Sequence, residues 1–418
     1  MTAVSTPVAA ARRSTVGLVV LLGSMAALGA VTIDLYLPSL PDVAADLGTT
    51  PAQAQLTITG VLVGAGFGQL LVGPLSDAFG RRGPAIAGFG LYVVACLLCS
   101  TAQSLETLAL FRVLAGVGSS AGSVIGMAVI RDLFVGPVAA RLMSRLVLVI
   151  GVAPLFAPTV GGALAGVWGW RIVLALLVVA GLGVLVAVWR RLPETRPEVA
   201  APADGSVATR GRRVRGAFAG YLPLLRDARF LGLAVMPGLS LATIMSYVSV
   251  SPFVLQEGFA LTSSQFAMLF ALNGVALVGG SQLNAALMER FGSQALLRTG
   301  VLLSLVFSGA LLWVVLSDVR SLVALVVPLW LLLGSAGLVM PNAVTLALEP
   351  YGASAGSAAA LVTAVQSGLG GLVGALTGLL GGDDTAMVTV MVGATVGNAV
   401  LLAVAAQRSG RRRAARTS

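Results

Sequence analysis

Twelve long apolar runs constrain the fold of this chain more than any other feature. Each holds about 20 mainly apolar residues, the length that an α-helix needs to cross the hydrocarbon core of a bilayer. The runs cover residues 15–37, 55–76, 83–102, 106–130, 141–166, 169–190, 229–252, 264–287, 296–317, 320–342, 353–380 and 385–406. Only 10% of the 418 residues are charged, against roughly a quarter in a soluble protein. The sequence therefore predicts an all-α polytopic membrane protein with twelve transmembrane helices.

The first run has a second interpretation. The stretch ARRSTVGLVVLLGSMAALGA has the basic start and small-residue end of a cleaved signal peptide. The apolar run continues past that end through Asp34 to Leu37, however, and eleven further runs follow it. We therefore favour a membrane span.

The arginines predict how the bundle is oriented. They cluster before the first run, after the second, fourth, sixth and eighth runs and in the C-terminal tail, whereas the alternate loops are mainly acidic. By the positive-inside rule, both termini and the long polar loop 192–228 face the cytoplasm. Topology thus accounts for the net charge of +10, and we expect no nucleic-acid partner. The loop divides the chain into six-span halves at 1–191 and 229–407, with a basic tail at 408–418.

The composition excludes several classes of chemistry. All 26 basic residues are Arg, and the chain has no Lys and no His. It therefore lacks the Lys of a Walker A phosphate loop or a Schiff base, and the His of a Ser-His-Asp triad. Cys96 and Cys99 have CxxC spacing, but inside an apolar run they fit small packing residues better than a redox or metal site. We predict no enzyme, no cofactor and no metal site.

Two segments suggest an internal repeat. GQLLVGPLSDAFG at 68–80 and GSQLNAALMERFG at 280–292 align with an offset of 212 residues, from Gly80 to Gly292. The alignment also pairs Gly68 with Gly280 and Asp77 with Glu289. Two similar six-span halves around a central site are a common plan of secondary transporters.

Longer motifs strengthen this interpretation. GPLSDAFGRRG (73–83), RVLAGVGSSAG (112–122) and GVAPLFAPTVGGALAG (151–166) resemble signatures of the major facilitator superfamily. DLYLPSLPDVAADLG (34–48), VIRDLF, GWR, LPET and PNAVTLAL narrow the resemblance to its Bcr/CflA drug-resistance branch, over nearly the whole chain. The resemblance implies the fold of that superfamily and a monomer that exports drugs in exchange for protons across the bacterial cytoplasmic membrane. Ala78 and Ala115 depart from the family pattern, where Arg or Lys and Gln are usual.

Asp34 and Arg112 are charges inside apolar runs, where a charge is costly and usually functional. Both are expected in the outer half of the bilayer, on the first and fourth spans. One interpretation is an ion pair that only locks these helices. We favour proton coupling, with Asp34 as the carrier and Arg112 beside it.

The resemblance also implies moving parts. Asp77, Gly80, Arg81 and Arg82, with Glu289 and Arg290 in the second half, are expected to form a cytoplasmic gate, in which Asp77 accepts bonds from backbone N–H groups of a neighbouring helix. A simple topogenic turn is the alternative. The helix-five motif, with Gly151, Pro154, Pro158, Gly161 and Gly162, is expected to bend where the halves meet, or to be ordinary small-residue packing.

Residues that could contact a substrate near the midplane are the polar, aromatic and sulfur-bearing ones inside the spans: Tyr36, Met127, Met245, Tyr247, Asn273, Asn342 and Gln366. For each, helix packing is an equal alternative. A cavity with few polar groups suits amphiphilic drugs, such as chloramphenicol- or bicyclomycin-type antibiotics. The partners expected are thus a small drug, protons and the lipid bilayer, and the proton gradient is the driving force. Transport of a natural metabolite, such as an amino acid derivative, remains open, whereas a lipid-modifying enzyme or a sensor fits poorly.

Overall fold

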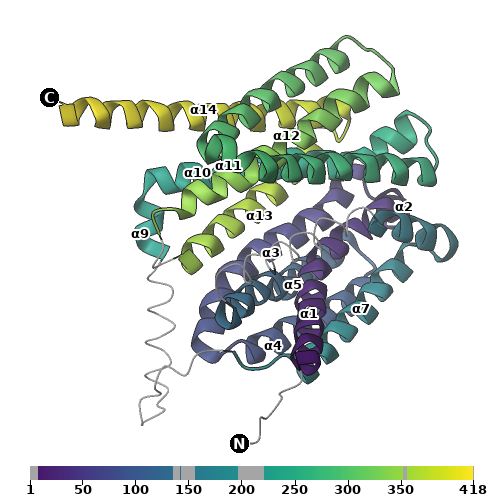
Figure 1. Cartoon of the computed structure of the whole chain (residues 1–418). Helices are drawn as coiled ribbons and strands as arrows, with labels where there is room; N and C mark the ends of the chain where they lie inside the picture. Colours follow the sequence, from purple (N-terminus) through teal and green to yellow (C-terminus); the bar gives the residue numbers. More distant parts are fainter. Residues whose placement is uncertain (1–7, 135–141, 143–155, 196–220, 352–354, 418) are drawn as a thin grey trace, which may run out of the picture.

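The computed structural model describes residues 8–134, 142, 156–195, 221–351 and 355–417. Nearly all of these residues are helical, and the described part contains no β-strand. The elements are α1 (Val8–Asp34), the 3₁₀ turn η1 (Leu37–Ser39), α2 (Leu40–Asp46), α3 (Pro51–Phe79), α4 (Arg82–Ser100), α5 (Leu105–Leu133), the helix Phe156–Trp168, α7 (Trp170–Arg191), α9 (Tyr221–Arg226), α10 (Ala228–Pro252), the π-helix η2 (Phe253–Gly258), α11 (Ser263–Leu316), α12 (Leu322–Leu348), α13 (Ala355–Leu379) and α14 (Asp384–Thr417) (Figure 1).

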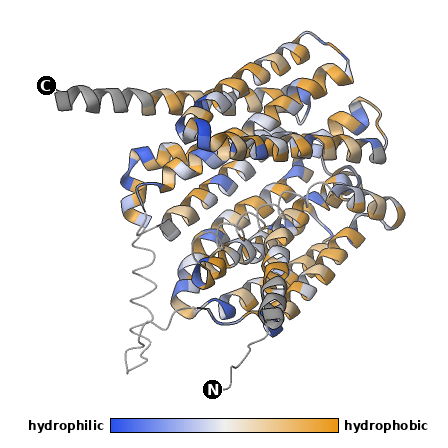
Figure 2. Ribbon diagram, viewed as in Figure 1, coloured by the Kyte–Doolittle hydropathy of each residue, from blue (hydrophilic) through white to orange (hydrophobic). Residues whose placement is uncertain are grey.

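Ten described helices are long and apolar enough to cross a membrane. One of them, α11, is 54 residues long and contains Gly292, whose φ of 72° and ψ of 163° are not helical, so it holds two predicted spans. The predicted span 141–166 lies largely outside the described residues, and its last part is the helix Phe156–Trp168. Large apolar side chains, among them Phe67, Met268 and Trp313, are exposed on the bundle. Hydrophobic residues predominate along most of the helices (Figure 2). The predicted all-α membrane fold is confirmed.

The internal repeat extends further than the loop motif. Helix α3 begins with a capping box in which Thr50 and Gln53 bond reciprocally, and α11 begins with the same box made by Thr262 and Gln265. A capping box satisfies backbone N–H groups that a helix start leaves free. Both boxes precede their glycine, Gly80 or Gly292, by the same number of residues, and both glycines have positive φ. The two halves therefore start this helix in the same way and interrupt it at the same relative position with a glycine of positive φ.

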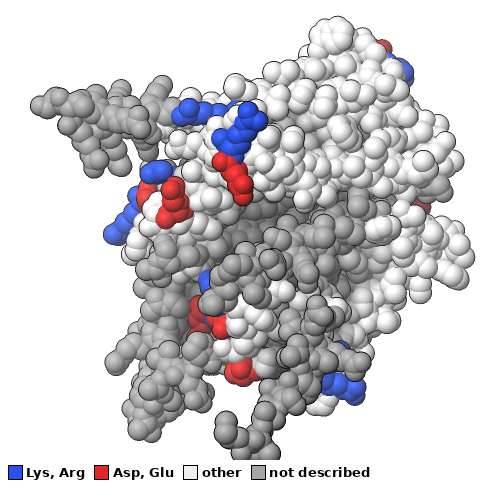
Figure 3. All heavy atoms as spheres, in the orientation of Figure 1, with Lys and Arg blue, Asp and Glu red and all other residues white. Residues whose placement is uncertain are grey.

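The chain forms two groups of helices that meet along α3 and α13 (Figure 1). We call the end of the bundle where α7 stops at Arg191 and α9 starts at Tyr221 the linker end, and the end where α4 stops and α5 starts the far end. The predicted polar linker contains the short helix α9. This helix packs on the first half, since Tyr221 is buried and donates its hydroxyl to the Leu70 carbonyl of α3 at 3.4 Å. In the view of Figure 3, the charged side chains of the described residues form a few small groups, and most of the remaining described surface is uncharged.

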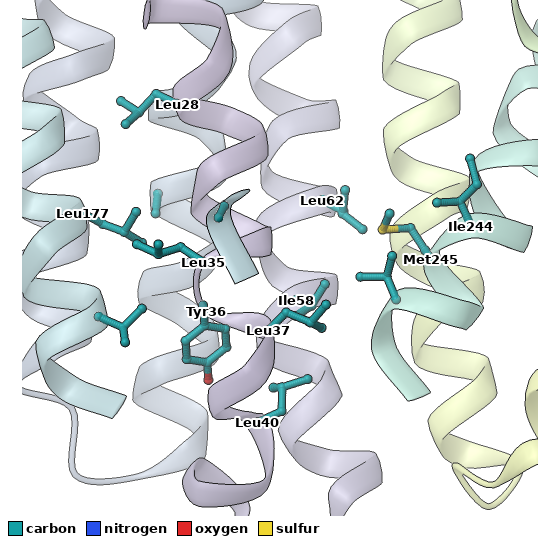
Figure 4. Close-up of a cluster of buried hydrophobic side chains, with 14 of the residues drawn as sticks. Leu28, Leu35, Tyr36, Leu37, Leu40, Ile58, Leu62, Leu177, Ile244 and Met245 are labelled. Carbon is teal, nitrogen blue, oxygen red and sulfur yellow. The ribbon is translucent and has the colours of Figure 1, made fainter. Parts of the chain in front are cut away.

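Between the two groups, buried apolar side chains form one continuous core. Leu37, Ile58 and Leu62 come from the first group, and Ile244 and Met245 come from α10 of the second. Figure 4 shows Leu62 and Met245 pointing toward each other across the space between the halves. The halves are therefore held together by apolar contact over this region.

Candidate functional site

The C-terminal end of α1 leaves a backbone carbonyl free. The Tyr36 N–H bonds to the Ile33 carbonyl at 3.2 Å, where a continuing α-helix would bond it to the Thr32 carbonyl. The break has a local cause, because Pro38 has no N–H to offer the Asp34 carbonyl. The turn η1 follows directly. Thr32 therefore presents an unused carbonyl oxygen inside the bundle.

Arg112 of α5 binds this free carbonyl. Its side chain is completely buried, and both terminal nitrogens donate to the Thr32 carbonyl at 3.1 Å. The Nε atom donates to the Thr57 carbonyl of α3 at 3.4 Å, and the guanidinium lies 4.3 Å from the centre of the Tyr36 ring. Carbonyl dipoles and an aromatic face stabilise the buried cation without a carboxylate. Arg112 thus ties α1, α3 and α5 together.

Asp34 is also buried, with 6% of its surface exposed. Within the part of the chain that the structure describes, its carboxyl forms no hydrogen bond and no ion pair. The ion pair with Arg112 that the sequence left open is therefore not formed, because the freed Thr32 carbonyl occupies the guanidinium. Asp34 is therefore a buried acid without a described partner.

Buried hydroxyl groups lie in this region, and of their residues only Tyr36 was among the predicted site residues. The Thr32 and Tyr92 hydroxyls lie 2.7 Å apart, and the Thr57 hydroxyl donates to Tyr36 at 3.2 Å. Hydroxyl-bearing residues in apolar helices are usual packing elements, so the sequence carried no signal to single them out. Cys96 and Cys99 are buried and unpaired with each other, as packing residues are.

A second charged cluster lies at the linker end. Arg81, only 5% exposed, bonds through NH1 to Asp77 at 2.5 Å and through Nε to Asp132 at 2.8 Å. The Ser76 hydroxyl accepts a further bond from NH1 at 2.8 Å. The two carboxylates differ in setting, because Asp132 is 10% exposed and Asp77 is 58% exposed. Asp132 was not among the predicted residues.

Glu194 completes this cluster from just beyond α7. Its carboxylate accepts the backbone N–H groups of Arg81 and Arg82 at 2.8 and 3.2 Å, and so caps the start of α4. The predicted backbone contact of Asp77 with a neighbouring helix is absent among the described residues, and within this cluster Glu194 bonds to backbone N–H groups instead. Gly80 has a φ of 91°, and a side chain there would collide with the Glu194 carboxylate. Arg82 is exposed and donates to the Trp189 carbonyl at 2.6 Å.

The segment of the second half that corresponds to the Arg81 cluster has fewer polar contacts among the described residues. Glu289 makes no described ion pair, and Arg290 lies 5.4 Å from the centre of the Phe291 ring. Repeat symmetry places Ser293 where the first half has Arg81. The second half therefore keeps the backbone turn at Gly292 without the buried arginine.

Two residues of the helix-five motif, Gly151 and Pro154, lie outside the described residues. Pro158 is buried in the helix Phe156–Trp168. A methyl group at Gly161 would collide with the Leu35 carbonyl of the broken α1 end, whereas one at Gly162 would make ordinary contact with Pro38 at 3.5 Å. This helix therefore packs directly on the segment that carries Asp34.

The predicted substrate contacts fall into different settings. Tyr247 accepts a bond from Asn273 Nδ2 at 2.9 Å and stacks on Phe270 at 5.6 Å, so both residues join α10 to α11. Asn342 is fully buried and donates to Asn284 at 2.5 Å, which marks it as packing between α11 and α12. The others are Tyr36 under Arg112, Met245 in the apolar core, Met127 at 43% exposed and Gln366 half-buried without a described side-chain bond.

Comparison with known proteins identifies the fold. The sequence profile of the Major Facilitator Superfamily matches residues 20–375. The chain belongs to this superfamily. Similar proteins are the uncharacterized MFS-type transporter YdgK of Bacillus subtilis (35% identical over 82% of this chain and 83% of that one), the chloramphenicol resistance protein of Pseudomonas aeruginosa (32%, 86% and 82%) and multidrug resistance protein D of Escherichia coli (30%, 85% and 87%).

The three-dimensional comparison agrees with the family. The structure of the xylose transporter XylE from E. coli, in a partially occluded inward-open conformation, matches with a TM-score of 0.69 over 92% of this chain and 97% of that one, at 13% identity. The predicted resemblance to drug-resistance transporters of the Bcr/CflA type is confirmed by the relatives. The protein is a transporter and not an enzyme.

Proposed function

We propose that this protein exports drug-like small molecules in exchange for protons, by alternating access, in the bacterial cytoplasmic membrane. Relatives that carry the names chloramphenicol resistance protein and multidrug resistance protein D support a drug substrate. Chloramphenicol-type and bicyclomycin-type antibiotics are the substrates to test first. The distribution of arginines supports a cytoplasmic linker end and cytoplasmic termini. The working unit is a monomer.

The observation that carries the proton-coupling part is the setting of Asp34. It is a buried carboxyl near the end of α1, and no described residue pairs with it. An intramembrane acid without a counter-charge is expensive, and such groups commonly mark ion or proton pathways. The proton enters from the outer face when the transporter opens there, and leaves toward the cytoplasm before the drug is loaded. Arg112 supports this role by holding the α1 end in place, rather than by charge pairing.

Two residues of the second half are proposed to contact the drug. Tyr247 and Asn273 combine an aromatic face with an amide whose Oδ1 atom has no described partner. A site with one aromatic surface and few hydrogen-bonding groups suits an uncharged amphiphilic molecule. Asn342 is not included, because packing accounts for its burial.

The test is drug-induced proton release from purified protein in detergent, with chloramphenicol first in a small panel. Wild type is expected to release protons on binding, and Asp34→Asn to bind the drug without release. Asp42→Asn is the matched control, because Asp42 is an exposed acid of α2 near the same end. If Asp34→Asn released as many protons as wild type does, the assignment of Asp34 as the proton carrier would be overturned. Drug binding without release from any variant would overturn proton exchange as a whole.

A further inference from the structure

The contact between α3 and α13 contains two glutamines in opposite situations. They are Gln55 and Gln69, which lie fourteen residues, or nearly four helical turns, apart on α3 and therefore on the same face. Both are buried, at 0% and 6% exposed. Each lies against α13, Gln55 near the far end and Gln69 nearer the linker end. The two residues therefore allow a hydrogen-bonded and an unbonded amide to be compared within one interface.

Gln69 is bonded across the interface. Its Oε1 atom accepts the hydroxyl hydrogen of Ser367 at 3.3 Å, so a polar group of each half satisfies the other. A buried polar group that is bonded in this way adds little cost to the packed interface.

Gln55 has no such partner. Neither its Nε2 nor its Oε1 atom forms a hydrogen bond within the part of the chain that the structure describes. Its amide is covered by the end of α13 and the turn that follows, where a Cβ at Gly378 would lie 2.9 Å from Oε1 and one at Gly382 would lie 3.5 Å from Nε2. The closeness at Gly378 leaves no space between that position and the amide oxygen. A buried amide without partners is among the costliest neutral groups in a protein interior.

We infer that Gln55 is a gate residue that opposes closure of the far end. The closed arrangement is the one that the structure shows, in which α13 covers Gln55 at the far end. The apolar contacts between the halves favour this arrangement, and the unbonded Gln55 amide disfavours it. When the halves separate at this end, the amide reaches water or a new partner and the penalty disappears. The residue thus keeps the two conformations close in free energy, which a transporter needs because it must visit both. This inference uses only the alternating conformations of the fold, and it stands whatever the substrate or coupling ion is.

The experiment measures the distance between spin labels at Gln103 and Ser317, exposed positions at the far end of the two halves. Cys96 and Cys99 are first replaced by Ala. Gln55→Leu removes the unbonded amide and keeps the apolar bulk, so the ratio of closed to open molecules should rise about tenfold, which corresponds to about 1.4 kcal/mol. Gln55→Glu should shift the ratio toward the open form, because a buried charge costs more than an amide.

Gln69→Leu is the matched control. It removes a bonded amide from the same interface, so it should not increase the closed population. The inference is overturned if Gln55→Leu leaves the ratio unchanged or opens the far end, since the amide would then be satisfied when closed. If wild type is already almost wholly closed, Gln55→Glu gives the deciding result. No opening in that variant would equally overturn the inference.

Discussion

Both terminal nitrogens of Arg112 donate to the carbonyl of Thr32, two residues before Asp34 in the chain, and the Asp34 carboxyl is left out of the contact. The two charges are thus not paired with each other. Arg112 binds the end of α1, and the Asp34 carboxyl has no partner among the described residues. This separation makes the two residues distinguishable by experiment.

The first prediction contrasts stability with transport. Arg112→Met removes the donors that satisfy the Thr32 carbonyl, and a buried group left unbonded costs ~1–3 kcal/mol. Asp34→Asn breaks no described bond and should leave the unfolding temperature in detergent almost unchanged. Thermal unfolding of the two purified variants checks this difference. An equal loss of stability in both would mean that the charges act as a pair after all.

A second prediction concerns the helix Phe156–Trp168. Gly161→Ala should impair folding or stall transport, because the new methyl group would collide with the rigid Leu35 carbonyl. Gly162→Ala should be tolerated, because its methyl would make only ordinary contact with Pro38. Expression level and drug efflux of the two variants provide the measurement. Wild-type behaviour of Gly161→Ala would contradict the close packing of this helix on α1.

A third prediction uses the two carboxylates around Arg81. Breaking a buried ion pair costs about 3–5 kcal/mol, whereas an exposed pair contributes about 0–1 kcal/mol. Asp132→Asn should therefore destabilise the protein strongly, and Asp77→Asn only slightly. Asp77→Asn should instead slow turnover while drug binding stays nearly intact. Comparable unfolding temperatures for the two variants would show that burial does not separate them.

A fourth prediction is a pH dependence in the second half. The Tyr351 hydroxyl donates to Asp227, the residue that caps α10, and this bond holds the pKa of the Asp227 carboxyl below its usual range. A lowered pKa stabilises the fold above the unfolded-state value, and the contribution is lost as pH falls through the folded-state value. Tyr351→Phe should thus be less stable than wild type near neutral pH, and the difference should shrink in acid. Unfolding temperatures measured from pH 7 down to pH 3 test the sign.

The sequence predicted the helices well because the bilayer enforces them. A span must satisfy its own backbone bonds and present apolar side chains, and both demands appear in the local sequence. The partner of Arg112 could not be predicted in this way. It depends on the Thr32 carbonyl, which is left free where α1 ends, and on a side chain eighty positions later that reaches it in space. Glu194 was missed for the same reason, since it caps a helix that begins more than a hundred residues earlier.

The position of Glu194 also has a mechanical consequence. The chain that joins the two halves leaves the first half directly after Glu194 and Thr195, and both are anchored there, one to the start of α4 and the other to Asp132 at 3.3 Å. Any displacement of the second half that pulls on this chain therefore acts first on the Arg81 cluster. The charged cluster is therefore also the point at which the first half anchors its last described residues, so its ion pairs connect the packing of that half with the coupling between the halves.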